Sequence, residues 1–166
     1  HNMIKMDALK KMLENMGFQN VETYIQTGNV FVDSEEENAA SVGFKIKQEI
    51  SKEFGYDVPV VMVSREDLEL CFKNNPYLKE KDCDTKKLYV AFISKELSPL
   101  ALNDLKISNF KPDEAAIDSS RIYIKYAVGA GKTKLDQKYI EKKLNVVATV
   151  RNWNTVTTLL NMYDKE

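Results

Sequence analysis

The order of strand-like and helix-like patterns in the second half of this sequence is the feature that most constrains its fold. The apolar run "KLYVAFI" predicts a strand, and "EAAID" and "RIYIKYA" predict a β-hairpin that turns at Ser119 and Ser120. Apolar residues at helical spacing predict helices over 100–107, 134–144 and 153–163, and "VVATV" between the last two predicts another strand. The resulting order, β-α-β-β-α-β followed by a helix, is that of the ferredoxin-like motif.

The first half shows a related order of patterns. A helix over 6–16 comes first, then the strands "VETYI" and "NVFVDS", a helix that ends at Gly55, and the apolar run "VPVVMV", which predicts a buried strand. Ser64, with Asp67 three residues later, predicts a capping box at the start of a helix over 65–73.

The two halves match when one strand is added before Met6. We therefore expect an α+β fold with two tandem ferredoxin-like (β-α-β-β-α-β) halves, each followed by an extra helix, in which the first strand of the N-terminal half is missing from this chain. The expected domains are residues 1–78 and 79–166. Little residue identity joins the halves, so the duplication is inferred from the pattern of elements alone.

Composition and charge exclude several classes of protein. The 166 residues carry a formal net charge of -1, so no global field attracts nucleic acid or a membrane surface. No apolar run approaches the roughly 18 residues of a membrane-spanning helix, and no charged and then apolar region marks a secretory signal. Cys71 and Cys83 lack zinc-site companions, and the only histidine is His1, which argues against a Ser-His or Cys-His catalytic pair. We expect a cytoplasmic protein with no metal and no cofactor.

The stretch "AVGAGKTKLDQ" resembles the phosphate-binding loop of a nucleotide-hydrolysing enzyme. That loop reads G-x-x-x-x-G-K-[ST], and counting back from Gly131 places Tyr126 where its first glycine belongs. The strand that follows, "VVATV", carries no acid to hold magnesium. The sequence therefore disfavours nucleotide hydrolysis. Two interpretations stay open: a turn with solvated lysines, or an anion contact at a helix start that is aided by Lys132 and Lys134.

The run "RNWNTV" is the second candidate motif. Asn152 is suited to cap the last helix, and Trp153 is suited to anchor that helix in the core. The same two residues, with Arg151 and Asn154, form a polar and aromatic cluster at a helix N-terminus, where an anionic ligand is favoured. Both interpretations stay open.

Tyrosines in strands supply the third candidate and a test of RNA recognition. In "TYIQTGN", alternation puts Tyr24 and Gln26 on one strand face, which either packs or lines a cleft.

RNA-recognition domains share the β-α-β-β-α-β order, but neither "GNVFVDS" nor "RIYIKYA" fits their third-strand signature. Tyr123 and Tyr126 differ in parity, so they cannot stack bases on one strand face. The sequence therefore disfavours a nucleic-acid partner.

Several blocks of the sequence resemble a known family. The chain is similar to the mostly bacterial domain of unknown function family sixteen-ninety-seven in its opening, "IKMDALKKMLENMGFQNVETYIQTGNVFVDS", and further along in "NNPY", "LYVAFI" and "KLDQKYIEKKLNVVATVRNWNTVTTLLNM". Members of that family begin with a strand and a loop resembling "LLRGINVGG", which this sequence lacks. The resemblance implies two ferredoxin-like halves and no established activity.

These observations lead to functional hypotheses of two classes. The first is a non-enzymatic cytoplasmic module that binds a small anionic or nucleotide-like ligand, or a partner, in the cleft between the halves. The second is a histidine-independent enzyme that acts on a phosphate-bearing substrate, with tyrosine and lysine as acid and base groups. A weak nucleic-acid-binding module is a further alternative, no membrane partner is indicated, and the oligomeric state stays open. The candidate ligand-binding residues are Lys132, Lys134, Arg151, Asn152, Trp153, Asn154, Tyr24 and Gln26.

Overall fold

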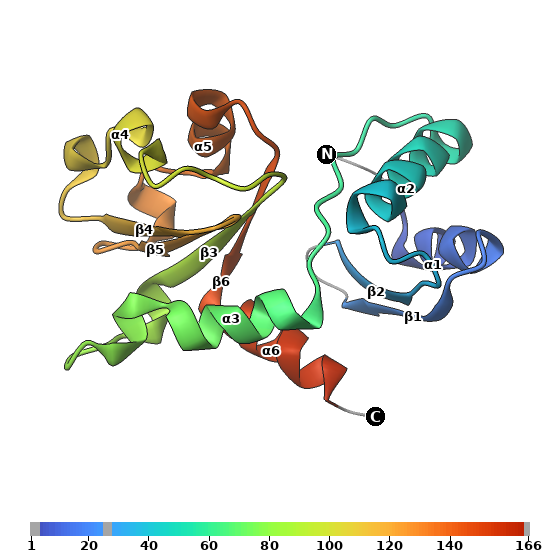
Figure 1. The fold of residues 1–166 in the computed structure, drawn as a ribbon, viewed down its shortest axis with the longest axis horizontal. Helices are drawn as coiled ribbons and strands as arrows, with labels where there is room; N and C mark the ends of the chain where they lie inside the picture. Colours follow the sequence, from blue (N-terminus) through green and yellow to red (C-terminus); the bar gives the residue numbers. More distant parts are fainter. Residues whose placement is uncertain (1–3, 25–27, 165–166) are drawn as a thin grey trace. The chain divides into compact units, whose positions relative to one another are not determined.

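A computed structural model of the chain describes residues 4–24 and 28–164. The α+β class predicted from the sequence is confirmed, because helices combine with one two-stranded and one four-stranded sheet in these residues (Figure 1). Contacts divide the chain into two compact units, His1–Met62 and Val63–Glu166. The predicted domain boundary lies further along the chain, after residue 78.

The first unit pairs two helices with a two-stranded antiparallel sheet. Its elements are α1 (Met6–Asn15), β1 (Gln19–Tyr24), β2 (Asn29–Asp33) and α2 (Ala39–Phe54). The Asn38 side chain accepts a hydrogen bond from the amide of Ser41 at the start of α2, and Gly55 ends that helix with a φ of 76°, which glycine adopts without strain. The core consists of Met12, Leu13, Val21, Val42, Ile46 and Ile50.

The apolar run "VPVVMV" does not form the strand that its composition predicts. Residues 58–63 have no regular secondary structure and pair with no strand among the described residues. Val58, Val60 and Met62 pack against the core of the first unit instead. Gly43 of α2 permits this close approach, because a Cβ at that position would lie 2.9 Å from Cγ of Met62. Packing against the core therefore half-buries Val58, Val60 and Met62 without a strand ladder, while Pro59 stays exposed.

The second unit begins with α3 (Arg65–Asn74) and then follows the predicted β-α-β-β-α-β order. Its strands are antiparallel to their neighbours and lie in the order β4-β5-β3-β6. Helices α4 and α5 lie over one face of this sheet, and α3 and α6 lie over the other (Figure 1). The elements after α3 are β3 (Leu88–Ile93), α4 (Ala101–Leu105), β4 (Glu114–Asp118), β5 (Arg121–Lys125), α5 (Gln137–Leu144), β6 (Ala148–Asn152) and α6 (Trp153–Tyr163).

Side-chain caps set the starts of α3 and α5. The predicted capping box of α3 is confirmed, since Ser64 accepts from the amide of Asp67 and Asp67 accepts from the amide of Ser64. The helix predicted from residue 134 begins instead at Gln137. Asp136 accepts from the amide of Tyr139 at 2.9 Å and is the N-cap, so the preceding residues stay outside the helix.

The outer edge of β6 is bonded to side chains of α5. The amide of Val150 donates to Oε1 of Gln137 at 3.0 Å, and the amide of Ala148 donates to Oε2 of Glu141 at 3.0 Å. The two acceptors are one helical turn apart on α5. They occupy donors that an exposed edge strand would otherwise offer to another chain.

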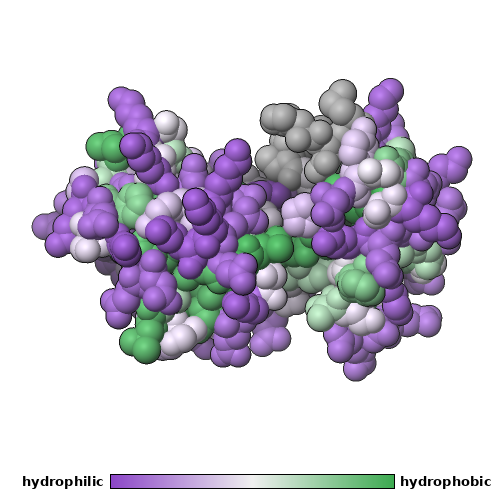
Figure 2. Space-filling view, turned by 90° about the horizontal axis from the view of Figure 1, so that it is seen from above, coloured by the Kyte–Doolittle hydropathy of each residue, from purple (hydrophilic) through white to green (hydrophobic). Residues whose placement is uncertain are grey.

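One core cluster of the second unit lies between its sheet and helices α4 and α5, where Ala91, Ile122, Ile124, Leu135 and Ile140 are buried. Hydrophilic side chains predominate on the molecular face that Figure 2 shows. Within residues 4–24 and 28–164, no helix has the length and apolar character needed to cross a membrane.

Candidate functional site

Two of the predicted motifs leave the sheet of the second unit at the same end. Tyr89, at the start of β3, pairs with Ile124 of β5 on one side and with Asn152 of β6 on the other. The glycine-rich loop after β5 and the junction of β6 with α6 therefore begin on either side of β3. Strand spacing separates these two starting points by roughly 10 Å.

Asn152 and Trp153 hold structural positions in this junction. Asn152 accepts from the amide of Thr155 at 2.8 Å and caps α6. Trp153 is buried and packs on Phe72 of α3, with ring centroids 4.7 Å apart. The cap and core-anchor interpretation of these two residues is therefore confirmed. Contact with a ligand stays a prediction for both.

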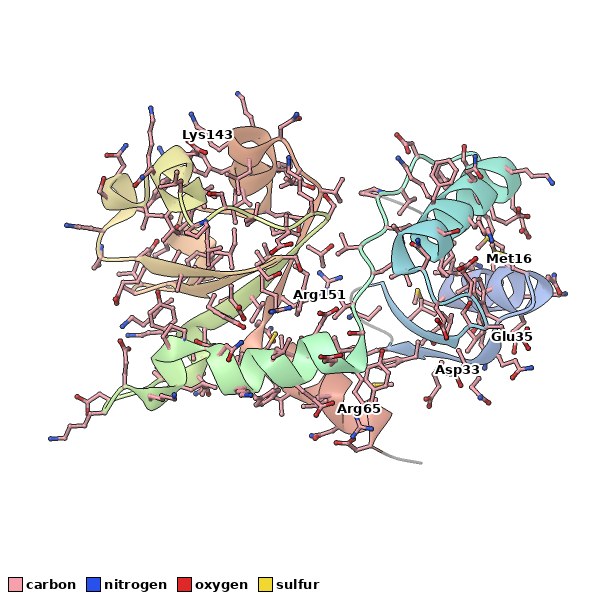
Figure 3. The ribbon with its side chains drawn as sticks, in the orientation of Figure 1. Met16, Asp33, Glu35, Arg65, Lys143 and Arg151 are labelled. Carbon is pink, nitrogen blue, oxygen red and sulfur yellow. The ribbon has the colours of Figure 1, made fainter. Side chains whose placement is uncertain are left out.

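The other predicted contacts are distributed differently. Arg151 is half-buried, its Nη1 donates to the carbonyl of Val150 at 3.1 Å, and burial lowers the pKa of Arg151 (Figure 3). Asn154, Lys132 and Lys134 are exposed. Since α5 begins at Gln137, neither lysine stands at a helix start.

Two predicted contacts belong to the first half of the chain. Tyr24 is half-buried at the end of β1, where it pairs with Asn29 of β2. Gln26 lies outside the described residues. The predicted grouping of these two residues with those of the second unit stays a prediction.

The buried carboxylate of Asp113 accepts two hydrogen bonds from the glycine-rich loop. The amide of Ala127 donates to Oδ1 of Asp113 at 2.8 Å, and the hydroxyl of Thr133 donates to Oδ2 at 2.8 Å. Asp113 is buried, and Gly129 turns the loop with a φ of 93°. A carboxylate of the protein thus receives an amide and a hydroxyl from a loop of the kind that elsewhere holds a phosphate.

A pocket of about 310 Å³ opens beside this loop. Its walls come from the segment 77–88, from Pro112 and the first residue of β4, and from the end of β5 and Ala127. Leu88, Pro112 and Ala127 provide apolar surface, and Cys83 also lines the pocket. Its charged residues are Glu80, Asp82, Asp84, Glu114, Lys87 and Lys125.

Sequence reasoning missed this pocket. The charged stretch "EKDCD" reads as a solvated loop, and nothing local connects it to β4 or β5. The contact that defines the pocket, from Lys125 to Glu80, spans 45 residues of sequence. Only the sheet register brings these segments together.

Lys125 is the best-defined group in the pocket. Its Nζ lies 2.8 Å from Oε1 of Glu80, 2.6 Å from Oε2 of Glu114 and 5.4 Å from the centroid of the Tyr77 ring. The hydrogen bonds to Glu114 and Glu80 raise the pKa of Lys125, so it remains an ammonium. Burial, together with the charge of Glu114, raises the pKa of Tyr77 to about 12, so the phenol remains neutral.

A partly buried ion-pair network centred on Arg121 joins α3 to the sheet. Arg121 is 4% exposed, and its Nη1 and Nη2 lie 3.2 Å from Oδ1 of Asp67 and 3.1 Å from Oδ2 of Asp118. The Tyr123 hydroxyl donates to Asp118 at 2.6 Å, and Nδ2 of Asn74 donates to it at 3.1 Å. Burial alone would raise the pKa of Asp118, but these hydrogen bonds and the guanidinium hold it below its ordinary value.

A second ion pair joins α3 to α6. Arg65, which lies in the first turn of α3 (Figure 3), bonds to Asp164, which follows the last turn of α6. Together with the Phe72–Trp153 contact, this pair holds the two helices against each other. No group of three or more His, Cys, Asp and Glu side chains within the described part of the chain is arranged to hold a metal ion.

Comparison with known proteins identifies the family and the fold. A search of curated proteins gave no match. Among solved structures, the chain is similar to "conserved bacterial protein SP0830 from Streptococcus pneumoniae", with 21% sequence identity and a TM-score of 0.69 over 98% of this chain and 90% of that chain. At that identity the likeness shows a shared fold. A family model described as "Protein of unknown function (DUF1697)" matches residues 1–123, and the chain belongs to that family.

Proposed function

We propose that this protein is a non-enzymatic module that binds a small ligand in the pocket of the second unit. The observation that carries the proposal is the pocket itself, a concave site of about 310 Å³ in which charged groups converge on apolar walls. This volume is at the lower end of the range for small-molecule sites. It suits a compact ligand.

The protonation states of the neighbouring groups favour binding over catalysis. A general base or nucleophile that works near neutral pH needs a pKa close to that pH. The raised pKa values of Lys125 and Tyr77 keep the first charged and the second neutral. Cys71 is fully buried beyond the pocket, and burial raises its thiol pKa to about 12. These directions argue against the predicted enzyme with tyrosine and lysine as acid and base.

The charge of the pocket argues against an anion as its ligand. Four carboxylates line it against two lysines, and one of those lysines, Lys125, is already bonded to Glu80 and Glu114. An added anion would face four carboxylates at short range, where like charges repel even though these side chains are exposed. We therefore assign this pocket to a ligand that is not an anion.

Blocking the pocket tests the proposal without knowledge of the ligand. Ala127 lines the pocket and bonds to Asp113 through its amide, so Ala127→Phe adds bulk at the pocket wall and keeps that bond. Val128→Phe is the matched control, because Val128 is 63% exposed and does not line the pocket. A thermal-shift screen of small cations, anions and neutral compounds should give ligands whose shift is lost in Ala127→Phe and kept in Val128→Phe. Shifts that survive in both variants, or no shift at all, would refute the proposal.

An anion site at the β6–α6 junction is a second candidate. It is favoured by the register, which starts the loop of Lys132 and Lys134 at the same sheet end as Arg151. Inorganic phosphate and nucleotides should then raise the melting temperature, because a ligand at 100 times its Kd stabilises the native state by about 2.7 kcal/mol. The shift should disappear in Arg151→Ala. The absence of a shift with every anion would remove this candidate and leave the pocket untouched.

We also propose that the first unit is a second copy of the same ferredoxin-like arrangement. Its helix, two strands, helix and segment 58–63 follow the order of α4, β4, β5, α5 and β6. In the second sheet β3 separates β5 from β6, so a strand between β2 and 58–63 would complete the match. A chain extended by a strand-forming segment before Met6 should protect one of the amides of Val60 and Val61 from hydrogen exchange, because successive amides of an edge strand point to opposite sides. Unchanged exchange at both amides would contradict the duplication.

A further inference from the structure

We infer that the pocket of the second unit is a site for a small organic diamine, a short methylene chain with an ammonium group at each end. The inference rests on the proposed function, since it names the ligand class of that same pocket. It starts from the charge balance of the walls. Glu80, Asp82, Asp84 and Glu114 line the pocket with only Lys87 and Lys125, an excess of two negative charges, and Oδ1 of Asp84 also accepts from the amide of Lys86 at 3.1 Å.

Lys125 shows how an alkylammonium binds in this pocket. Its Nζ lies between Glu80 and Glu114, at 2.8 and 2.6 Å, and 5.4 Å from the centroid of the Tyr77 ring. Two carboxylates and an aromatic face are the groups that bind an ammonium ion most strongly. The protein thus contains one ammonium site of this kind, which its own lysine occupies. The remaining carboxylates, Asp82 and Asp84, lie on the loop that forms the other wall.

The rest of the lining fits the body of a diamine better than it fits a metal ion. Pro112 and Ala127 offer accessible apolar surface against which a methylene chain can lie, and the buried Leu88 lies behind them. A divalent metal ion needs several carboxylate oxygens gathered at short distances. The part of the chain that the structure describes holds no such group of three or more Asp, Glu, Cys or His residues. Carboxylates that do not converge on one point are better matched by two ammonium groups on one chain than by a single metal ion.

The direct test is a calorimetric titration of the intact protein with 1,4-diaminobutane. Three comparators share one property each: 1-aminobutane has the chain with one charge, adipate has the same four methylenes with two negative charges, and Mg²⁺ has two positive charges without the chain. We expect the diamine to bind about tenfold more tightly than 1-aminobutane, the fold-change of one additional ion contact, and adipate not to bind. Tighter binding of 1-aminobutane, adipate or Mg²⁺ than of the diamine would overturn the inference.

Two isosteric variants locate the binding. Asp82→Asn removes one pocket charge, and Asp104→Asn removes an identical charge from an exposed position on α4 outside the pocket, so the net charge of both variants is the same. Diamine affinity should fall about threefold to tenfold in Asp82→Asn, as expected for one partly screened charge, and stay unchanged in Asp104→Asn. Equal affinity in the two variants would overturn the inference.

Lys125→Met is expected to increase the affinity for the diamine, an effect that damage to the fold would not produce. It removes the resident ammonium and leaves Glu80 and Glu114 without it, so the pocket becomes more negative. Diamine binding should become about tenfold tighter, because one ammonium of the ligand takes the place of Nζ. Weaker binding in this variant would overturn the inference.

The outcome also separates this inference from the proposed function. Ligands of another class whose binding is lost in Ala127→Phe would overturn the diamine assignment and support the pocket as a site. Binding of no compound from any class would overturn both. Diamine binding that is lost in Ala127→Phe and kept in Val128→Phe supports both.

Discussion

Removal of the Arg121 guanidinium should loosen α3 from the sheet. The side chain of Arg121 is 5% exposed, while its partners Asp67 and Asp118 are 35% and 26% exposed. Breaking a fully buried ion pair costs about 3–5 kcal/mol and breaking a surface pair costs about 0–1 kcal/mol. With one partner buried and two partly exposed, Arg121→Met should lower the free energy of unfolding by about 3 kcal/mol.

Asp118→Asn tests the same pair from the other side. The amide keeps the shape of the carboxylate and still accepts hydrogen bonds, but it leaves the buried guanidinium with Asp67 as its remaining ion-pair partner. We expect a loss of about 2 kcal/mol for this variant and about 3 kcal/mol for the double variant. The resulting coupling of about 2 kcal/mol is the signature of a direct interaction between the two side chains.

The assay is urea denaturation followed by fluorescence of Trp153, the only tryptophan. Trp153 packs on Phe72, so its emission reports the separation of α3 and α6 in the second unit. At an m value of about 2 kcal/mol per molar urea, a loss of 3 kcal/mol moves the midpoint by about 1.5 M. Lys125→Met, on the same strand with partly exposed partners, is the control and should cost less than about 1 kcal/mol.

The contribution of Asp118 to the free energy of unfolding should disappear as the pH is lowered. The pKa of Asp118 is lowered in the native state, so its stabilisation is complete above the unfolded-state pKa of about 3.9 and disappears as pH falls through the lower native value. The difference between wild type and Asp118→Asn should therefore be full at neutral pH and shrink in acid. Single losses below 1 kcal/mol, or coupling indistinguishable from zero, would refute the buried-network account.

Three further predictions follow from other parts of the structure. Replacement of Gln137 and Glu141 by alanine frees two amides on the edge of β6 and should produce self-association in size-exclusion chromatography, while a chain that stays at its original elution volume would contradict the edge-blocking role. Iodoacetamide should alkylate the half-buried Cys83 in the native protein and leave the fully buried Cys71 unmodified until urea unfolds the chain. In alkali, Tyr77 favours its neutral form in the fold, with a pKa of about 12 against about 10 in the unfolded chain, so stability should fall as pH rises above about 10. In ultraviolet titration, Tyr77→Phe should lack one phenol that ionises near pH 10 when the chain is unfolded, and no such phenol when it is native. Loss of a phenol that ionises near pH 10 from the native titration of Tyr77→Phe would contradict this assignment.

Most elements of the second unit could be predicted because their signals are local. The capping box of Ser64 and Asp67 lies within one helical turn, and the hairpin turn joins two adjacent strands. The start of α5 was wrong by three residues, because the apolar period extends past the point where Asp136 caps the helix. The strand predicted for residues 58–63 is wrong for a different reason. Its composition is that of a buried strand, but composition records burial and does not reveal whether a pairing strand is present.

The pocket and the network could not be predicted because their contacts are long in sequence. Arg121 and Asp67 are 54 residues apart, and Lys125 and Glu80 are 45 residues apart. Each of these residues alone resembles an ordinary solvated charge. The pocket forms only when the sheet aligns β5 with β4 and β3. That alignment places Lys125 opposite Glu114 on one side and Leu88 on the other.

The glycine-rich loop and the pocket are two sides of one short segment. Pro112 and Glu114 line the pocket, while Asp113 between them is buried and bonds to the loop at Ala127 and Thr133. The carboxylate that takes the donors of the loop therefore also fixes Ala127 as a pocket wall. The pattern of a strand, a glycine turn, lysine and threonine is the same in both cases. It does not show whether the hydrogen-bond donors of the loop bind a phosphate or an internal carboxylate. The chain's own Asp113 takes two of those donors here, so the loop that resembles an anion site shapes the wall of a pocket that favours a cation.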